Sequence, residues 1–209
     1  MIGVDVVFHT ATLHKPHIIS HDKQSFVDVN ISGTLTLLEE ARLAGVSRFI
    51  FTSSTSVFGD ALVPPPGQPA AWITEYVTPV AKNIYGATKV AAEDLCQLYA
   101  RNHNLPCTVL RVSRFFLEED DNELTRDEYD DQNCKVVEFT HRRVDIEDVL
   151  SAHILAMQQL PYLGFRKYII TATTPFTVDD VGLLRTDATA ALARVEPDFP
   201  EVFARLGWK

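Results

Sequence analysis

The sequence predicts an α/β fold built on a doubly wound parallel sheet. Short apolar, β-rich segments alternate with longer segments in which apolar residues recur every three or four positions, in the order strand, helix, strand, helix, strand. The connections between these strands are long enough for the crossovers that parallel strands require. With 209 residues, 46% of them hydrophobic and 22% charged, the chain can form one domain with a substantial core.

The first strand is expected at residues 3–8, an apolar stretch that ends at small and polar residues. A helix is expected over residues 20–44, where apolar side chains recur at three- and four-residue steps and Gly45 follows as a stop signal. Residues 48–52 form the next apolar strand, and a cluster of hydroxyl side chains follows it.

The proline-rich stretch 62–79 interrupts regular structure and is expected to be a surface excursion. The elements expected after it are helix 79–103, strand 107–112, helix 145–160, strand 166–172 and a short helix within 198–209. Thr177 and Asp180 have the spacing of a capping box, which predicts one further helix start.

The net charge of −9 is concentrated in one segment. Residues 118–131 contain nine acidic residues and one basic residue, which leaves the rest of the chain nearly neutral. A nucleic-acid partner would need a basic face, so the charge distribution argues against one. The acidic segment is interpreted as a solvated loop, with a divalent-cation site as the alternative.

No apolar run is long enough to cross a bilayer, and the N-terminus lacks the basic flank and cleavage site of a signal peptide. Three cysteines, Cys96, Cys107 and Cys134, are an odd and sparse set that suits free thiols in a reducing compartment. We therefore expect a cytoplasmic protein without a membrane partner.

Three side chains carry the most specific chemistry. Tyr85 and Lys89 are four residues apart and share one face of the expected helix. An ammonium beside a phenol favours the phenolate and would lower the pKa of Tyr85. Ser54, at the end of a strand, adds a hydroxyl, and the three together suit proton transfer at a carbinol or carbonyl. An ordinary exposed helix pair is the alternative.

Several motifs follow one another in an order typical of one family. They are V-F-H-T-A at 7–11, N-I-S-G-T at 30–34, F-T-S-S-T-S-V-F-G at 51–59, Y-G-A-T-K at 85–89, L-R at 110–111, V-D-I-E-D-V at 144–149 with His153 after it, and L-G-W at 206–208. In these motifs the chain resembles the extended short-chain dehydrogenase/reductases, and among them the NAD-dependent epimerase/dehydratase family. The collinear order makes the resemblance specific.

The resemblance implies a partial Rossmann-like doubly wound sheet, NAD or NADP as cofactor, and a sugar or nucleotide sugar as substrate. It implies that Tyr85 is the general acid/base, that Lys89 holds the ribose, and that Ser54 bonds the substrate oxygen. The cofactor-binding residues that it implies are Thr10, Ala11, Thr12, His14, Asn30, Thr52, Ser53, Tyr85 and Lys89. Arg114 replaces an asparagine of the family pattern and could meet an anionic substrate.

The resemblance also implies a division of the chain. Residues 1–115 are expected to form the remainder of the cofactor-binding domain and residues 116–209 a small substrate-binding region. Relatives often dimerise through two helices, one of which carries the Tyr-Lys pair, so a homodimer is one arrangement that the resemblance allows. The acidic segment falls where relatives build a substrate lid, and its carboxylates would repel a diphosphate.

One family feature is absent from the sequence. The nine glycines nowhere form the Gly-rich turn that binds a dinucleotide pyrophosphate. By the resemblance, the chain begins where the fourth strand of its relatives begins and lacks their N-terminal third, which would expose a sheet edge. The leading hypothesis is an epimerase/dehydratase-like oxidoreductase. The alternatives are a simple dehydrogenase or reductase, and an inactive remnant that acts as a binding module.

Histidines gather near the N-terminus, at positions 9, 14, 17 and 21. Their spacing allows two or three of them to share a helix face, which makes a metal site conceivable. No cysteine or carboxylate nearby completes a tetrahedral set, so we prefer loop histidines close to the cofactor and expect no metal.

Overall fold

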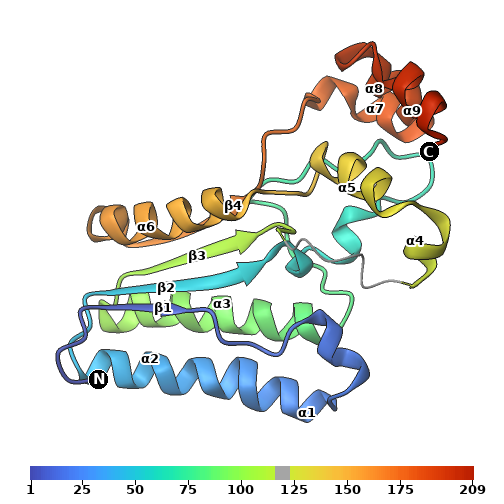
Figure 1. Cartoon of the computed structure of the whole chain (residues 1–209). Coiled ribbons are helices and arrows are strands. Elements are labelled where there is room, and N and C mark those ends of the chain that lie inside the picture. Colours follow the sequence, from blue (N-terminus) through green and yellow to red (C-terminus); the bar gives the residue numbers. More distant parts are fainter. Residues whose placement is uncertain (116–122) are drawn as a thin grey trace.

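The computed structural model describes residues 1–115 and 123–209 and shows a four-stranded sheet with helices on both faces (Figure 1). The strands are β1 (Val6–His9), β2 (Arg48–Ser54), β3 (Cys107–Val112) and β4 (Phe165–Ile170). They are all parallel and adjacent in chain order. The predicted α/β fold class and parallel sheet are confirmed.

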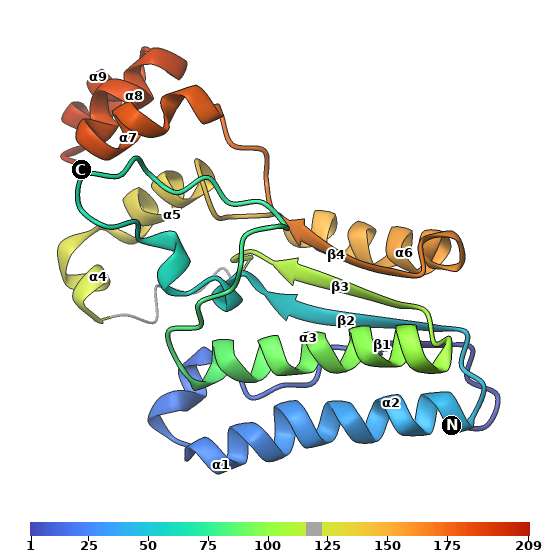
Figure 2. The ribbon, with the colours of Figure 1, turned by 180° about the vertical axis from the view of Figure 1, so that it is seen from behind.

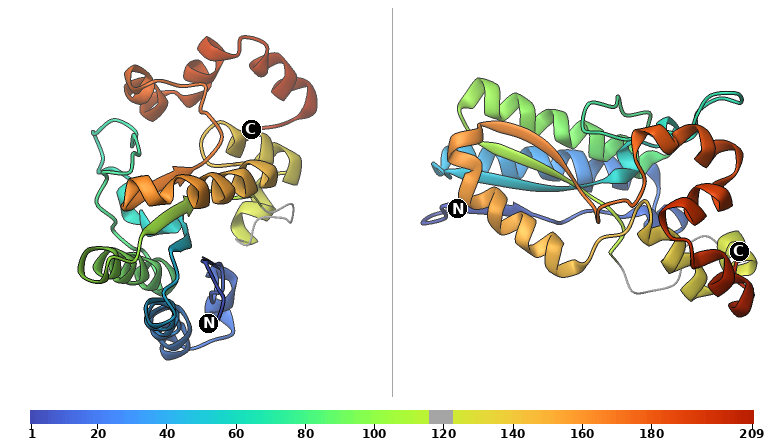
Figure 3. Two further views of the ribbon diagram at one scale, coloured as in Figure 1. Left: turned by 90° about the vertical axis from the view of Figure 1, so that its left-hand side faces the viewer. Right: turned by 90° about the horizontal axis from the view of Figure 1, so that it is seen from above.

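Three long helices cover the sheet. These three are α2 (Gly33–Leu43), α3 (Ile84–His103) and α6 (Ile146–Leu163). The other α-helices of the described residues are α1 (Lys23–Phe26), α4 (Glu123–Glu128), α5 (Asp131–Phe139), α7 (Val181–Thr186), α8 (Ala188–Val195) and α9 (Phe199–Leu206). Helices α2 and α3 lie on one face and α6 on the other (Figures 1 and 2), while α7, α8 and α9 form a separate cluster beyond the sheet (Figure 3). Within the described ranges, the length and apolarity needed for a membrane span occur together in none of the helices.

The last crossover differs in hand from the first two. Because the strands advance in one direction across the sheet, connections over opposite faces must have opposite hands. The β1–β2 and β2–β3 connections run over the α2/α3 face, whereas the β3–β4 connection runs over the α6 face (Figure 1). That last connection first passes through α4 and α5, so it is not a simple strand–helix–strand unit.

Side-chain alternation along β2 determines which of its residues face α2 and α3 and which face α6. Phe49 and Phe51 belong to the apolar cluster that packs under α2 and α3, whereas Ile50 belongs to the cluster under α6. The same alternation directs Ser53 toward α3 and Thr52 toward α6. Both faces of the strand are therefore buried, as expected for a parallel sheet.

Among the described residues, β1 is an edge strand, and the Phe8 side chain on it is 44% exposed. Helix α6 packs on β2, β3 and β4. The surface above β1 on the α6 side is therefore apolar and accessible.

Two expectations about the helices need correction. The predicted helix 20–44 is divided by a wider π-helical turn, Val27–Ser32, which places the Asn30 side chain in the interior. The predicted acidic loop is helical at Glu123–Glu128, and Asp130 caps α5 by accepting from two backbone N–H groups. Carboxylates favour helix starts, which explains why this acidic stretch is not simply a loop. Residues 118–122 of that segment lie outside the described residues.

Candidate active site

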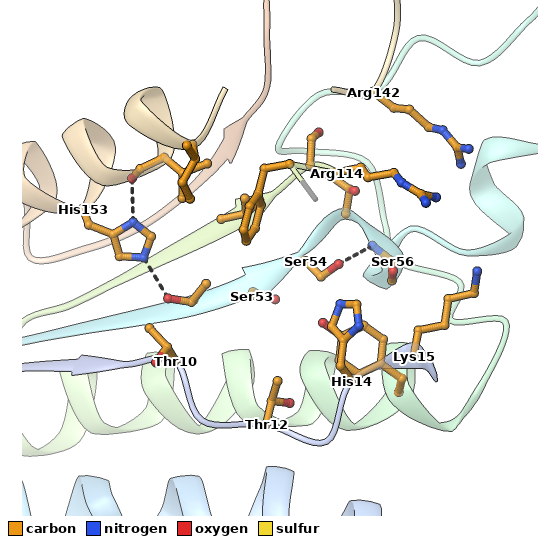
Figure 4. Close-up of a pocket in the computed structure, with 18 of the residues that line it drawn as sticks. Thr10, Thr12, His14, Lys15, Ser53, Ser54, Ser56, Arg114, Arg142 and His153 are labelled. Atoms are coloured by element: carbon orange, nitrogen blue, oxygen red, sulfur yellow. Dashed lines mark hydrogen bonds between the residues drawn. The ribbon is translucent and has the colours of Figure 1, made fainter. Parts of the chain in front are cut away.

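A cavity of about 1020 Å³ opens where β1, β2 and β3 end (Figure 4). This is the side of a parallel sheet at which open α/β proteins bind ligands. The predicted site residues that line it are Thr10, Thr12, His14, Thr52, Ser53, Ser54, Tyr85 and Arg114. The predicted residues Ala11, Asn30 and Lys89 are not among the residues that line it.

Ser54 and Tyr85 are brought together by the turn that follows β2. The Ser54 hydroxyl accepts from Ser56 N at 3.1 Å, which caps the turn Thr55–Val57. Helix α3 approaches that turn closely because Gly86 has no side chain, and a Cβ there would lie 2.7 Å from Ser56 O. The Ser54 hydroxyl is thereby held near enough to Tyr85 to act on the pKa of its phenol.

We expect Gly86→Ala to separate these two hydroxyls. The added methyl meets a backbone carbonyl that can move only with its turn, so a loss of about 1–3 kcal/mol in unfolding free energy is expected. Gly33→Ala is the matched control: it is also helical, but the nearest atom to its Cβ is 3.8 Å away. That variant should gain about 0.4–1 kcal/mol. Urea unfolding checks both values, and equal stability of the two variants would contradict the crowding at Gly86.

The environment of Tyr85 favours the neutral phenol. Burial raises the pKa of Tyr85 to about 12, and the nearby Ser54 hydroxyl acts in the opposite direction. The expectation that Lys89 lowers this pKa is wrong for this structure. The Lys89 ammonium donates to Thr52 O at 2.6 Å and lies 4.1 Å from the ring centre of Phe51.

Lys89 is almost fully buried and is not among the residues that line the cavity. Burial lowers its pKa to about 7, while the charge of Glu93 acts to raise it. Lys89 therefore fixes the end of β2 from the α3 side in this structure.

Asn30 connects the loop after β1 to helix α3. Its side-chain oxygen accepts from Leu13 N at 2.7 Å and from the Thr12 hydroxyl at 2.9 Å. Its amide nitrogen donates to Leu13 O and to the Thr88 hydroxyl, both at 3.0 Å. Thr88 in turn donates to Tyr85 O at 3.0 Å. Asn30 is thus placed to position backbone rather than to touch a ligand.

Of the four histidines in the N-terminal segment, His14, His17 and His21 contact one another in sequence, whereas His9 is buried apart from them. His14 lies against the Tyr85 ring, with 4.8 Å between ring centres, and its backbone N–H donates to His17 Nδ1 at 2.8 Å. His9 is buried against the Thr34 hydroxyl at 2.8 Å, and burial lowers its pKa to about 4. In the part of the chain that the structure describes, no group of three or more potential ligands could hold a metal ion.

Cationic side chains gather at one end of the cavity. Arg142 and Arg143 both pair with Glu138, and Arg114 Nε lies 3.7 Å from the same carboxylate. Arg114, Arg142 and Lys15 line the cavity (Figure 4). Of these three, only Arg114 was predicted from the sequence. Arg142 stands two positions before the V-D-I-E-D-V motif, a signal that could have identified it.

Helix α6 supplies the opposite wall, which the sequence reasoning did not assign to the site. Leu150 and Ile154 line the cavity together with Phe8, and all three are at least 44% exposed. His153 lies on the same helix and bonds to Thr52 (Figure 4). The cavity therefore has a hydroxyl-rich wall and an apolar wall.

A parallel sheet with helices on both faces and such a cavity at the carboxyl ends of its strands is the architecture of a Rossmann-type α/β fold. The model of the NAD dependent epimerase/dehydratase family matches residues 1–163. The chain belongs to this family, which confirms the resemblance seen in its motifs.

Individual relatives agree with the family match. The chain is 36% identical over 103 residues to a UDP-glucose 4-epimerase from Erwinia amylovora, a match to 47% of this chain and 27% of the relative. It is 35% identical over 115 residues to 3beta-hydroxysteroid dehydrogenase/Delta(5)-Delta(4) isomerase 1 from Caenorhabditis elegans, covering 54% and 23%. The matched part thus spans about a quarter of these relatives.

A solved structure shows the same fold. MoeE5 in complex with UDP-glucose and NAD superimposes with a TM-score of 0.63 at 22% identity, over 90% of this chain and 64% of that chain.

Proposed function

We propose that the chain provides the hydride-transfer site of an NAD(P)-dependent enzyme that epimerises or dehydrates a sugar carried as a nucleotide sugar. The observation that carries this proposal is that Tyr85 and Ser54 both line a cavity at the carboxyl ends of parallel strands, with the Ser54 hydroxyl near enough to act on the pKa of Tyr85. Family membership supports the same chemistry.

The donor set fits the nicotinamide and ribose half of the cofactor. The hydroxyls of Thr10 and Thr12 can bond ribose oxygens, and the wall formed by Phe8 and Leu150 can pack on a flat ring. The sequence contains no Gly-rich turn for the pyrophosphate. When bound, the cofactor supplies the hydride acceptor and donor.

Side chains of the protein would transfer the proton to and from the substrate. Tyr85 would take the proton of the substrate hydroxyl in one direction and return it in the other. Ser54 would donate to the substrate oxygen as its charge changes. Lys89 is not among the residues that line the cavity, and in this structure its ammonium supports the strand by donating to Thr52 O.

The cationic end of the cavity supports an anionic substrate. Arg114 and Arg142 could pair with a phosphate or carboxylate oxygen. The Erwinia relative, whose name states a UDP-sugar reaction, supports a nucleotide sugar in particular.

A simple dehydrogenase is the second candidate, and the Caenorhabditis relative favours it. Incubation of the chain with millimolar NAD and UDP-glucose separates the two. An epimerase converts the sugar with no net change at the nicotinamide absorbance band, whereas a dehydrogenase produces a growing band. Sugar conversion without net NADH is the result we expect.

We expect the 209-residue chain to bind NAD weakly. A Gly-rich turn at a helix N-terminus normally supplies backbone N–H groups and a favourable dipole to the pyrophosphate, and no such turn occurs in this sequence. Isothermal titration calorimetry should therefore give no micromolar binding. A micromolar dissociation constant would show that the chain holds the pyrophosphate by other means.

A further inference from the structure

The Thr52 hydroxyl lies within hydrogen-bonding distance of a histidine on α6. Thr52 directs its side chain toward α6, where His153 Nε2 lies 2.8 Å from Thr52 Oγ1. The other ring nitrogen, Nδ1, lies 2.7 Å from the carbonyl oxygen of Val149 (Figure 4). Both Thr52 and His153 line the cavity, although no sequence motif assigned a role to the histidine.

The two contacts determine the direction of both hydrogen bonds for a neutral His153 imidazole. A carbonyl oxygen can only accept, so His153 Nδ1 must carry a hydrogen. In a neutral imidazole the other nitrogen is then an acceptor, and Thr52 must donate its one hydroxyl hydrogen to Nε2. The Thr52 oxygen consequently offers only lone pairs to whatever lies beside it in the cavity.

We propose that His153 is a positioning residue that fixes Thr52 as a hydrogen-bond acceptor facing the cavity. The ligand group that lies against the end of β2 is then a donor, such as a ribose hydroxyl or an amide N–H. The backbone of Thr52 is held as well, because its carbonyl accepts from Lys89 at 2.6 Å on the other side of the sheet. The identity of the ligand as a dinucleotide rests on the proposed function. The assignment of the Thr52 hydroxyl as an acceptor toward the cavity does not.

Because Thr52 can only accept a hydrogen bond from a ligand, the two ends of the cavity suit different parts of that ligand. A phosphate or carboxylate oxygen beside Thr52 would meet lone pairs and gain no hydrogen bond. Arg114 and Arg142 lie at the other end of the cavity from His153 (Figure 4). The donor-bearing part of a ligand therefore belongs at the His153 end and its anionic part at the arginine end.

The first test reads the tautomer directly. Long-range 1H–15N correlation spectra of the full chain at neutral pH should show His153 with its proton on Nδ1 and an unprotonated Nε2. The Thr52→Val variant should change the Nε2 shift, since that nitrogen loses its donor. A proton on Nε2 would overturn the proposal, because Thr52 would then accept from the histidine and be free to donate to the ligand.

The second test uses NAD as the probe, titrated to millimolar concentration and followed by NMR. Thr52→Val and His153→Leu should each weaken binding roughly 2- to 10-fold, the effect of one hydrogen bond. Thr52→Ser and His153→Gln should bind like the wild type, because each keeps its half of the pair. His153→Leu should add nothing in the Thr52→Val background.

Unchanged binding by Thr52→Val, or additive effects of the two changes, would contradict the proposal. If NAD binds to no variant and not to the wild type, the cofactor assignment of the proposed function fails, and the tautomer measurement still decides whether the Thr52 hydroxyl is an acceptor toward the cavity.

Discussion

Replacing Glu93 with glutamine is expected to lower the free energy of unfolding by about 3–5 kcal/mol, the cost of breaking a buried ion pair. Glu93, on α3, is fully buried and accepts from Arg111 Nη2 at 2.8 Å and from the Ser53 hydroxyl at 2.6 Å. Lys167 lies 3.2 Å from the same carboxylate. A neutral amide leaves the buried guanidinium of Arg111 without its counter-charge.

Urea unfolding of the full chain measures the loss. The double variant Glu93→Gln/Arg111→Met should recover part of it, because the unpaired charge is removed together with its partner. Arg42→Gln is the control, since it removes an exposed pair with Glu39 and should change stability little. Wild-type stability of Glu93→Gln would show that the buried pair does not hold α3 to β3.

The strands of the sheet were predictable because local pattern and tertiary position agree. The apolar run of β3 was predicted at its observed bounds, Cys107–Val112, and every residue of it is buried. Helix α3 starts at Ile84 rather than at residue 79, because Asn83 caps it by accepting from Gly86 N at 3.0 Å. Such a cap is visible in the sequence, but the proline-rich stretch before it obscured the start.

Other features of the fold depend on tertiary contacts. The π-helical turn around Asn30 exists because its amide reaches both the loop after β1 and Thr88, residues far apart in the sequence. The hand of the last crossover depends on the face to which α6 docks. The helix α8 was not predicted at all.

The candidate site was predictable to the extent that motifs report residue types. The motifs indicated Ser54 and Tyr85 together, and both residues line the same cavity. The partner of Lys89 is a backbone carbonyl, which no side-chain motif can show. Burial controls the pKa of Tyr85, and His153 comes from a helix about a hundred residues beyond Thr52, so neither effect could be read from spacing.

Tyr85→Phe is expected to reduce turnover by about 10²–10⁴-fold, the usual contribution of a positioned acid/base. The variant removes only the hydroxyl, and the ring still packs against His14. NAD affinity should therefore change little. Tyr99→Phe is the matched control on the same helix: its hydroxyl bonds to Glu39, and it is not among the residues that line the cavity.

The raised pKa of Tyr85 determines how the rate of hydroxyl oxidation depends on pH. With a pKa of about 12, Tyr85 is protonated at neutral pH in this structure. It is then ready to donate a proton but must be deprotonated to accept one. Oxidation of a hydroxyl should accelerate as pH rises toward that value, and Tyr85→Phe should abolish the acceleration.

The assignment of Tyr85 is tested most directly by the rate of UDP-glucose conversion at millimolar NAD, measured for the wild type, Tyr85→Phe and Tyr99→Phe. The account predicts conversion by the wild type and Tyr99→Phe, and a loss of at least about 100-fold in Tyr85→Phe at unchanged NAD affinity. Equal rates for the wild type and Tyr85→Phe would contradict the central claim that the Tyr85–Ser54 pair carries the reaction.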